Sequence, residues 1–425
     1  MFCVGVPIYF TPDEGGGIEI YAKNLIEHLQ KSDKKNEYLI FCSSINEGAF
    51  PITNKNFKKV LMWWPGKKNK PMVIVRTRLT TTLLTFTEKV YKKLSTIVEG
   101  NKYLKNIKNR IKWIYDFFLS AEPLKSSEYN MLHFMFTIIP PSWIEKDYYV
   151  PLILTVHDIQ QEYFPEFFSN EVLDFRRRLY RTSVEKVNHI IAISSYTKKT
   201  LIEKYAVPED KITVIYNGYN NEIFKKIDGR LIEKIQKKYN LPRSFLFYPA
   251  ATWPHKNHIT LLKAYKILKT KYHFEDKLIF TGIRKENHEA VERETERLGL
   301  AGSVTHLGYL PYKDLPALYN AARLMVFPSL FEGFGIPVVE AMAVGLPVTC
   351  SNTTSLPEIA SDSALYFDPK EPEDIAEKVI RLYGDESLRS FLINKGKERV
   401  KLFTWDNTAS ETLKIYKNVF KNYYG

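Results

Sequence analysis

Short apolar segments alternate along the chain with longer segments in which apolar residues recur at helical spacing. Strands interleaved with helices in this way are typical of parallel β-sheets, and nearly continuous apolar strands indicate sheets covered on both faces. In the first half, the pattern predicts strands at 2–6, 38–42, 59–62, 131–134, 152–156, 190–193 and 212–215. In the second half, it predicts strands at 245–249, 277–281, 304–308, 324–328, 347–350 and 365–367. We therefore expect an α/β protein.

A polar, charged stretch at 220–240 separates the two runs of strands. The 425 residues suffice for two domains at about 100–200 residues each. We expect a Rossmann-like, doubly wound domain on the acceptor side at 1–225 and a second such domain, which binds the donor, at 240–405. A last helix at 406–425 is expected to pack back on the first domain. Ligands in such sheets bind beyond the carboxyl ends of the strands. Two facing domains would therefore share an interdomain cleft that can hold a donor and an acceptor, which favours a transferase.

The net charge of +13 comes almost entirely from residues 55–112, where sixteen Lys or Arg residues outnumber two acids. The same stretch carries Trp63 and Trp64. A basic, aromatic surface is suited to an anionic membrane or to a diphosphate-linked acceptor, although a solvated helical face is an equal alternative. No known nucleic-acid-binding motif is present, so we expect no nucleic-acid partner.

The sequence offers no continuous apolar run of the ~18 residues that a membrane span needs. Residues 1–10 are apolar but lack a basic leader, and we interpret them as a strand and not as a signal peptide. The cysteines, Cys3, Cys42 and Cys350, are few and widely spaced, which is typical of a reducing compartment and gives no metal-ligand pattern. We expect a cytoplasmic protein, with peripheral attachment to the inner face of the membrane left open.

The strongest candidate site lies in the segment SLFEGFGIPVVEAM at 329–342. Gly333 and Gly335 allow the backbone to approach a ligand, and the free N–H groups of the helix that follows can bind a diphosphate. Glu332 lies in the loop and Glu340 about one turn into the helix. Carboxylates repel phosphates, so we expect both to accept hydrogen bonds from sugar hydroxyls. The alternative is a structural junction with solvated glutamates.

Three further positions are candidates because each follows a predicted strand. Lys256 precedes a helix, where its ammonium can neutralise a leaving diphosphate; a solvated helix start is the alternative. His157 can bind a donor hydroxyl, or it is a packed or capping histidine. Gly16 and Gly17, between the first strand and first helix, allow close ligand approach or form a tight turn.

These residues resemble the retaining GT-B glycosyltransferases of family 4, also called glycosyl transferases group 1. The resemblance rests on the E-x7-E spacing from Glu332 to Glu340 and on the flanking FPSxxEGFGxP and EAMAxGxPV, and it is strongest over 245–369. It implies a GT-B fold, with Glu340 on the donor ribose hydroxyls and Glu332 on the transferred sugar. It also places His157 beside that sugar.

The resemblance further assigns backbone contacts. It implies that Gly333, Phe334 and Gly335 lie near the sugar and diphosphate, and that Leu310 borders the base pocket. It places a glycine pair, here Gly16 and Gly17, near the diphosphate and the acceptor.

The sequence departs from the family pattern at one position, where the family usually has an arginine. Lys256 matches a lysine of the family, but the arginine usual six residues earlier is Ala250 here. Arg284 is a candidate replacement, and His255 and Trp253 are others. The family needs no metal or other cofactor, in agreement with the lack of an Asp-x-Asp motif in a suitable loop.

The segment WPHKNH at 253–258 is similar to that of bacterial O-antigen and polysaccharide mannosyltransferases, many of which use GDP-mannose. We expect transfer of a hexose from a nucleotide-sugar, with GDP-mannose favoured, to a hydroxyl of a glycan or lipid-diphosphate-linked acceptor with retention of configuration. UDP-sugars and other GDP-sugars stay open. The alternatives are a nucleotide-sugar epimerase or phosphorylase of the same architecture, and a non-catalytic protein that binds sugar nucleotides or lipid.

Overall fold

The computed structural model describes residues 1–8, 16–42, 46–61, 128–144 and 146–425. Each strand that the apolar pattern predicts is present, and its ends differ from the predicted ones by at most two residues. The predicted α/β class is therefore confirmed.

The first sheet has the strand order β3-β2-β1-β4-β5-β6-β7. Strand β1 pairs in parallel with both β2 and β4, β2 with β3, and β4 with β5. The strands are β1 (Cys3–Pro7), β2 (Glu37–Cys42), β3 (Phe57–Leu61), β4 (Met131–Phe134), β5 (Leu152–Val156), β6 (His189–Ala192) and β7 (Ile212–Val214). The helices described in this half are α1 (Gly16–Ser32), α4 (Pro141–Ile144), α5 (Asn170–Lys186) and α6 (Ser195–Tyr205).

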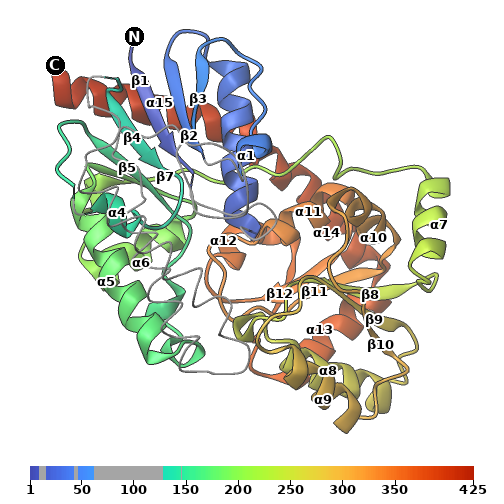
Figure 1. Cartoon of the computed structure of the whole chain (residues 1–425). Helices are drawn as coiled ribbons and strands as arrows, with labels where there is room; N and C mark the ends of the chain where they lie inside the picture. Colours follow the sequence, from blue (N-terminus) through green and yellow to red (C-terminus); the bar gives the residue numbers. More distant parts are fainter. Residues whose placement is uncertain (9–15, 43–45, 62–127, 145) are drawn as a thin grey trace, which may run out of the picture. The chain divides into compact units, whose positions relative to one another are not determined.

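The second sheet has the order β10-β9-β8-β11-β12-β13, and its pairings are parallel. Its strands are β8 (Phe245–Pro249), β9 (Lys277–Thr281), β10 (Val304–His306), β11 (Leu324–Phe327), β12 (Val348–Ser351) and β13 (Leu365–Phe367). The helices are α7 (Gly229–Lys238), α8 (His258–Lys271), α9 (His288–Arg297), α10 (Leu315–Ala321), α11 (Ile336–Val344), α12 (Leu356–Ala360), α13 (Pro372–Gly384) and α14 (Glu386–Arg399). Figure 1 shows α10, α11 and α14 on one face of this sheet and α8, α9 and α13 on the other.

Burial on both faces explains why β11 is apolar at every position, whereas β12 adds only the small polar residues Thr349 and Ser351 to Val348 and Cys350. All four residues of β11 are fully buried, as are those of β12. Neighbouring parallel strands bring their carboxyl ends to one edge of the sheet, so the loops that follow β8, β11, β12 and β13 lie side by side there. This edge carries most of the predicted site.

The described chain divides into two compact units. One comprises Met1–Val156, Arg178–Ile191 and Leu413–Gly425, and the other His157–Arg177 and Ala192–Thr412. The loop after β5 thus belongs to the second unit. The domain limits at 225 and 240 and the facing of two domains across a cleft stay predictions.

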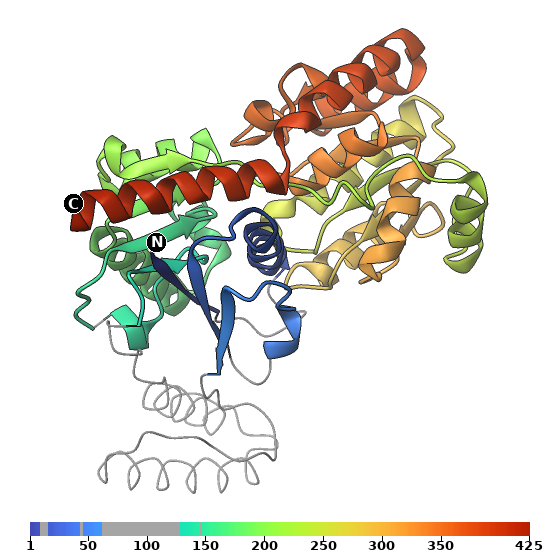
Figure 2. The ribbon, with the colours of Figure 1, turned by 90° about the horizontal axis from the view of Figure 1, so that it is seen from above.

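Helix α15 (Trp405–Tyr424) ends the chain, and Figure 2 shows its length. In the first unit, the buried Tyr416 of this helix shares a hydrogen bond of 2.7 Å with Nδ1 of His133 on β4. Its ring also meets that of Phe2 edge-on, with centroids 6.5 Å apart. The last part of α15 therefore packs on the first sheet.

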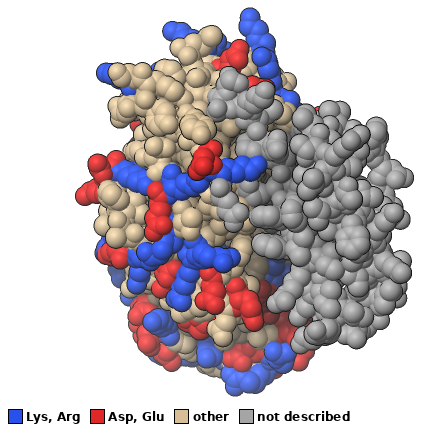
Figure 3. Space-filling model, turned by 60° about the vertical axis from the view of Figure 1, so that its left-hand side comes forward, with Lys and Arg blue, Asp and Glu red and all other residues tan. Residues whose placement is uncertain are grey.

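No helix among the described residues is long and apolar enough to cross a membrane. Most of the basic stretch at 55–112 lies in 62–127, outside the described residues. On the described surface seen in Figure 3, Lys and Arg side chains lie among Asp and Glu side chains, so that surface shows no extended patch of one sign. Membrane attachment through 55–112 stays a prediction.

Candidate functional site

The loop between β11 and α11 is the centre of the candidate site. Helix α11 begins at Ile336, as predicted, and Pro337 lies in its first turn, where a missing N–H costs nothing. Gly335 precedes the helix with φ +99°, a left-handed conformation that favours glycine. A Cβ atom on Gly333 would lie 2.0 Å from the carbonyl oxygen of His157. Both glycines are therefore required by the backbone of this loop.

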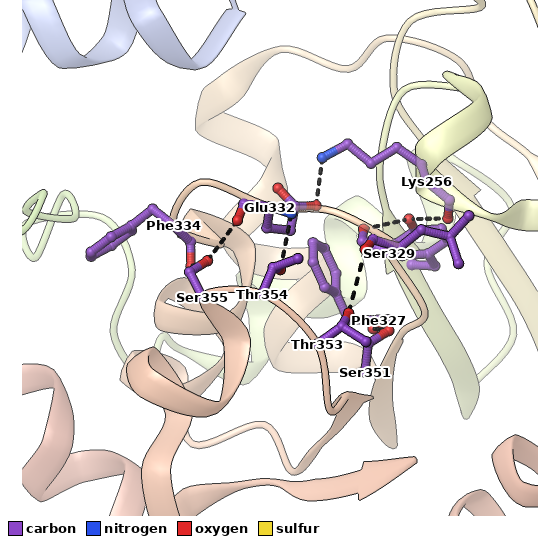
Figure 4. A network of polar contacts seen from close by, with 11 residues as sticks. Lys256, Phe327, Ser329, Glu332, Phe334, Ser351, Thr353, Thr354 and Ser355 are labelled. Carbon is purple, nitrogen blue, oxygen red and sulfur yellow. Dashed lines mark hydrogen bonds and ion pairs between the residues drawn. The ribbon is translucent and has the colours of Figure 1, made fainter. Parts of the chain in front are cut away.

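Side chains from two other segments hold the loop in place, and Figure 4 shows those of Thr354 and Ser355. The N–H of Glu332 donates to Oγ1 of Thr354 at 3.1 Å. The hydroxyl of Ser355 donates to the carbonyl oxygens of Glu332 and Phe334, at 2.9 and 3.1 Å. The hydroxyl of Ser194 donates to the carbonyl oxygen of Gly333 at 2.7 Å. The backbone of the loop is thus fixed independently of any ligand.

Gly333 also offers a direct test of this packing. We expect Gly333→Ala to cost about 1–3 kcal/mol of unfolding free energy, or more, because the new Cβ would overlap backbone atoms of the His157 loop. Urea denaturation measures the change. Gly302→Ala is the matched control, since its Cβ would meet nothing within 4 Å. Equal stability of the two variants would contradict the close approach of Gly333 to the carbonyl oxygen of His157.

The loop carries a short ion pair. Nζ of Lys256 lies 2.6 Å from Oε1 of Glu332, and their side chains are only 18% and 11% exposed. Charges shielded from water interact more strongly than a surface pair does. The two residues that the sequence places in separate motifs are therefore in direct contact.

The turn that carries Lys256 follows β8 at Pro254–Lys256. Asn257 ends it with φ +59°, a conformation that Asn tolerates. Its side-chain amide donates to the carbonyl oxygens of Pro328 and Pro369, at 3.1 and 2.7 Å. The hydroxyl of Tyr248 donates to the carbonyl oxygen of Lys256 at 2.6 Å. These bonds tie the loops after β8, β11 and β13 together.

Glu340 lies one turn inside α11 and is buried, with 5% exposure. The hydroxyl of Tyr319 donates to its Oε2 at 2.8 Å, and the hydroxyl of Tyr312 lies 3.5 Å from its Oε1. Burial raises the pKa of Glu340 to about 8, although the two hydroxyls oppose the rise. The carboxyl group is thus mostly protonated at neutral pH and can both donate and accept hydrogen bonds.

Arg284 is the predicted replacement for the family arginine that is Ala250 here. Gly282, with φ +130°, packs its backbone on Ala250: a Cβ there would lie 2.6 Å from the carbonyl carbon of Ala250. The next loop residues lead to Arg284, which is exposed. Burial, His288 and Arg284 together lower the pKa of His306 to about 4, so Arg284 lies toward the carboxyl end of β10.

His255 does not supply the missing charge. Burial, with Lys256 next in effect, lowers the pKa of His255 to about 2. The imidazole is therefore neutral at physiological pH, which corrects its proposed role as a cation. Lys256 and Arg284 are left as the candidates.

The other predicted residues are distributed over both units. His157 is buried, with its carbonyl oxygen against Gly333. The side chain of Phe334 is buried between Tyr216 and Phe403. Leu310 is buried as well, in the second unit. Gly16 and Gly17 begin α1 in the first unit, where Gly16 has φ +54°.

Among the described residues, no group of three or more His, Cys, Asp and Glu side chains could hold a metal ion. Metal independence of the reaction stays a prediction. The positioning residues Ser194, Thr354, Ser355 and Asn257 were not predicted. A signal for Asn257 is its place in the WPHKNH segment.

Comparison with known families matches both halves of the chain. The model of glycosyl transferases group 1 matches residues 231–399, and that of glycosyltransferase family 4 matches residues 84–222. O-antigen chain mannosyltransferase B of Escherichia coli is 30% identical over 317 residues, which are 71% of this chain and 82% of that protein. O-antigen chain mannosyltransferase RfbU of Salmonella typhimurium is 33% identical over 52% of this chain and 58% of that protein.

Solved structures agree on the fold. Sucrose-phosphate synthase from Thermosynechococcus elongatus has a TM-score of 0.69 at 18% identity, with 99% of this chain and 100% of that one covered. Anabaena HepE in complex with UDP-glucose has a TM-score of 0.68 at 16% identity, with 98% and 100% covered. The two parallel sheets with helices on their faces are those of a GT-B fold. The chain is a glycosyltransferase and belongs to family 4, the glycosyl transferases group 1.

Proposed function

We propose that this glycosyltransferase moves a mannosyl residue from GDP-mannose to a hydroxyl of a growing glycan, with retention of the anomeric configuration. The proposal rests first on the Lys256–Glu332 pair beside the start of α11. It draws support from the relatives that are named O-antigen chain mannosyltransferases. The expected setting is polysaccharide biosynthesis.

The contacts of Lys256 and α11 suggest which groups stabilise the negative charge that develops on the donor phosphate. As the bond between the sugar C1 and the donor phosphate breaks, negative charge grows on the phosphate. Lys256 and the N–H groups at the start of α11 would stabilise that charge. Glu332, whose carboxylate is now held by Lys256, would then hold a hydroxyl of the sugar. Glu340 would hold the ribose.

Retention requires that the acceptor oxygen bond to C1 on the face the phosphate leaves. In this route the acceptor hydroxyl loses its proton to the departing phosphate oxygen, so no carboxylate nucleophile is needed. This same-face route is the one expected of retaining glycosyltransferases of family 4.

The test is a transfer assay with GDP-mannose and a panel of UDP- and GDP-sugars on a mannose-containing oligosaccharide. We expect turnover with GDP-mannose, and NMR of the product should show an α-linkage, as in the donor. A β-linked product would overturn retention. Preference for another donor would overturn mannosyl transfer, and interconversion of the donor sugar without acceptor would indicate an epimerase.

We place the reaction in the cytoplasm, with the basic stretch at 55–112 on an anionic membrane surface. Flotation with anionic vesicles at low and high salt tests this, because binding by surface charge weakens as salt is raised. Absent or salt-insensitive binding would count against it.

A further inference from the structure

A pocket of about 410 Å³ lies beside the loop that carries Glu332. The volume falls within the ~300–1,000 Å³ usual for small-molecule sites. All of its lining residues belong to the second unit. We call it the aromatic pocket, after Tyr163, Phe164, Tyr196 and Phe331 in its lining. None of the predicted site residues lines it, so the proposed reaction gives it no role so far.

One wall of the aromatic pocket is built around Phe331, the residue before Glu332. Its ring is buried and lies 5.5 Å from that of Tyr163, 5.9 Å from Tyr196 and 6.1 Å from Phe164, measured between centroids. The three outer rings are partly exposed. These rings are already packed in place, so ordering them on binding a ligand would cost little conformational entropy.

The other wall is polar. Asn352 follows β12 and is exposed. Thr353 and Thr354 come next and are labelled in Figure 4. Asp368 and Lys370 follow β13 and carry opposite charges. The backbone N–H of Lys370 donates to Oδ1 of Asp368 at 2.9 Å. A wall of amide and hydroxyl groups with one charge of each sign suits a neutral ligand rich in hydroxyl groups better than it suits a phosphate.

The pocket lies away from the predicted nucleotide. In the sheet order β10-β9-β8-β11-β12-β13, Arg284 and Leu310 follow β9 and β10 at one end. The pocket's polar wall follows β12 and β13 at the other end. Lys256 and Glu332, which follow β8 and β11, lie between the two. A ligand in the pocket would therefore meet the reacting centre from the side opposite the nucleotide.

We propose that the aromatic pocket binds a pyranose unit of the glycan acceptor, an inference that rests on the proposed function. The apolar C–H face of a pyranose packs on aromatic rings, and its hydroxyls bond to amides and carboxylates. Asn352 and Asp368 supply those groups here. Thr354, which lines the pocket, also accepts the N–H of Glu332, so the bound sugar lies next to the group that fixes the catalytic loop.

The experiment uses mannotriose as the probe and follows its binding to the full chain by saturation-transfer NMR and by acceptor KM. Phe164→Ala and Asn352→Ala should each weaken binding and raise KM about tenfold. Asn352 contributes an exposed side chain, so its variant keeps the fold even if loss of Phe164 does not. Phe391→Ala on α14 is the matched control, an exposed aromatic residue outside the pocket.

The affinity for GDP and the slow hydrolysis of the donor without acceptor should stay unchanged in all three variants. Unaltered mannotriose binding in both pocket variants, or no binding by the wild type, would overturn the proposal. Loss of GDP affinity in both would do the same, by showing that the pocket holds the nucleotide. If the wild type binds mannotriose through the pocket but transfers no mannose, the proposed function fails and the pocket stands.

Discussion

Replacement of Lys256 with alanine is expected to lower kcat for sugar transfer by about 10²–10³-fold, equivalent to ~3–4 kcal/mol of lost transition-state stabilisation. The family arginine is Ala250 here, so the leaving diphosphate depends more on this one ammonium. Steady-state kinetics with saturating donor measures the loss. KM for the donor should rise less than kcat falls, because the phosphate charge is largest in the transition state.

The same change also removes the partner of a carboxylate that is only 11% exposed, so a loss of stability must be separated from a loss of catalysis. The double variant Lys256→Ala, Glu332→Gln removes both charges. It should regain much of the unfolding free energy without regaining transfer. Lys263→Ala on the exposed face of α8 is the matched control. Transfer at more than a tenth of the wild-type rate in Lys256→Ala would remove this residue from the catalytic site.

The framework of the site could be predicted because local patterns determine it. Gly335 next to Ile336-Pro337 predicts a helix start, and α11 begins there. The continuous apolar run before Ser329 predicts a buried strand, and β11 is fully buried. Both signals come from neighbouring residues, so no knowledge of the tertiary structure is needed.

The partners of the site could not be predicted in the same way. Ser194 and Gly333 are 139 positions apart, and nothing in either segment indicates that one hydroxyl would hold the other's carbonyl. The hydroxyl of Ser194 also caps α6, where it accepts the N–H of Thr197. Its second bond comes only from the packing of distant loops.

The ionisation of Glu340 also depends on tertiary structure, as the hydrogen bond from Ser194 to Gly333 does. The motif spacing places a carboxyl group on α11, but Tyr319 comes from α10 and lies 21 positions away. Its hydroxyl and the burial of the site together decide the charge of Glu340.

We expect Glu340→Gln to be more stable than the wild type at pH 8 and about equally stable below pH 4.5. An unfolded glutamate titrates near pH 4.3, whereas burial raises the folded pKa of Glu340 to about 8. Between these values the folded state holds a proton that the unfolded state has lost. The unfolding free energy of the wild type should therefore fall, relative to the variant, by up to about 1.4 kcal/mol per pH unit, or ~4 kcal/mol over three units.

Urea denaturation of both proteins at several pH values between 4.5 and 9 measures this difference, and titrations of all other groups cancel in it. Above pH 8 the difference should level off, because Glu340 is then ionised in both states. Glu377→Gln, an exposed change on α13, is the matched control. A flat difference across the range would mean that Glu340 is ionised when folded, and then it could only accept hydrogen bonds from a donor. A stability difference that changes with pH for Glu340→Gln but not for Glu377→Gln would mean that the free enzyme presents a neutral carboxyl group to the ribose.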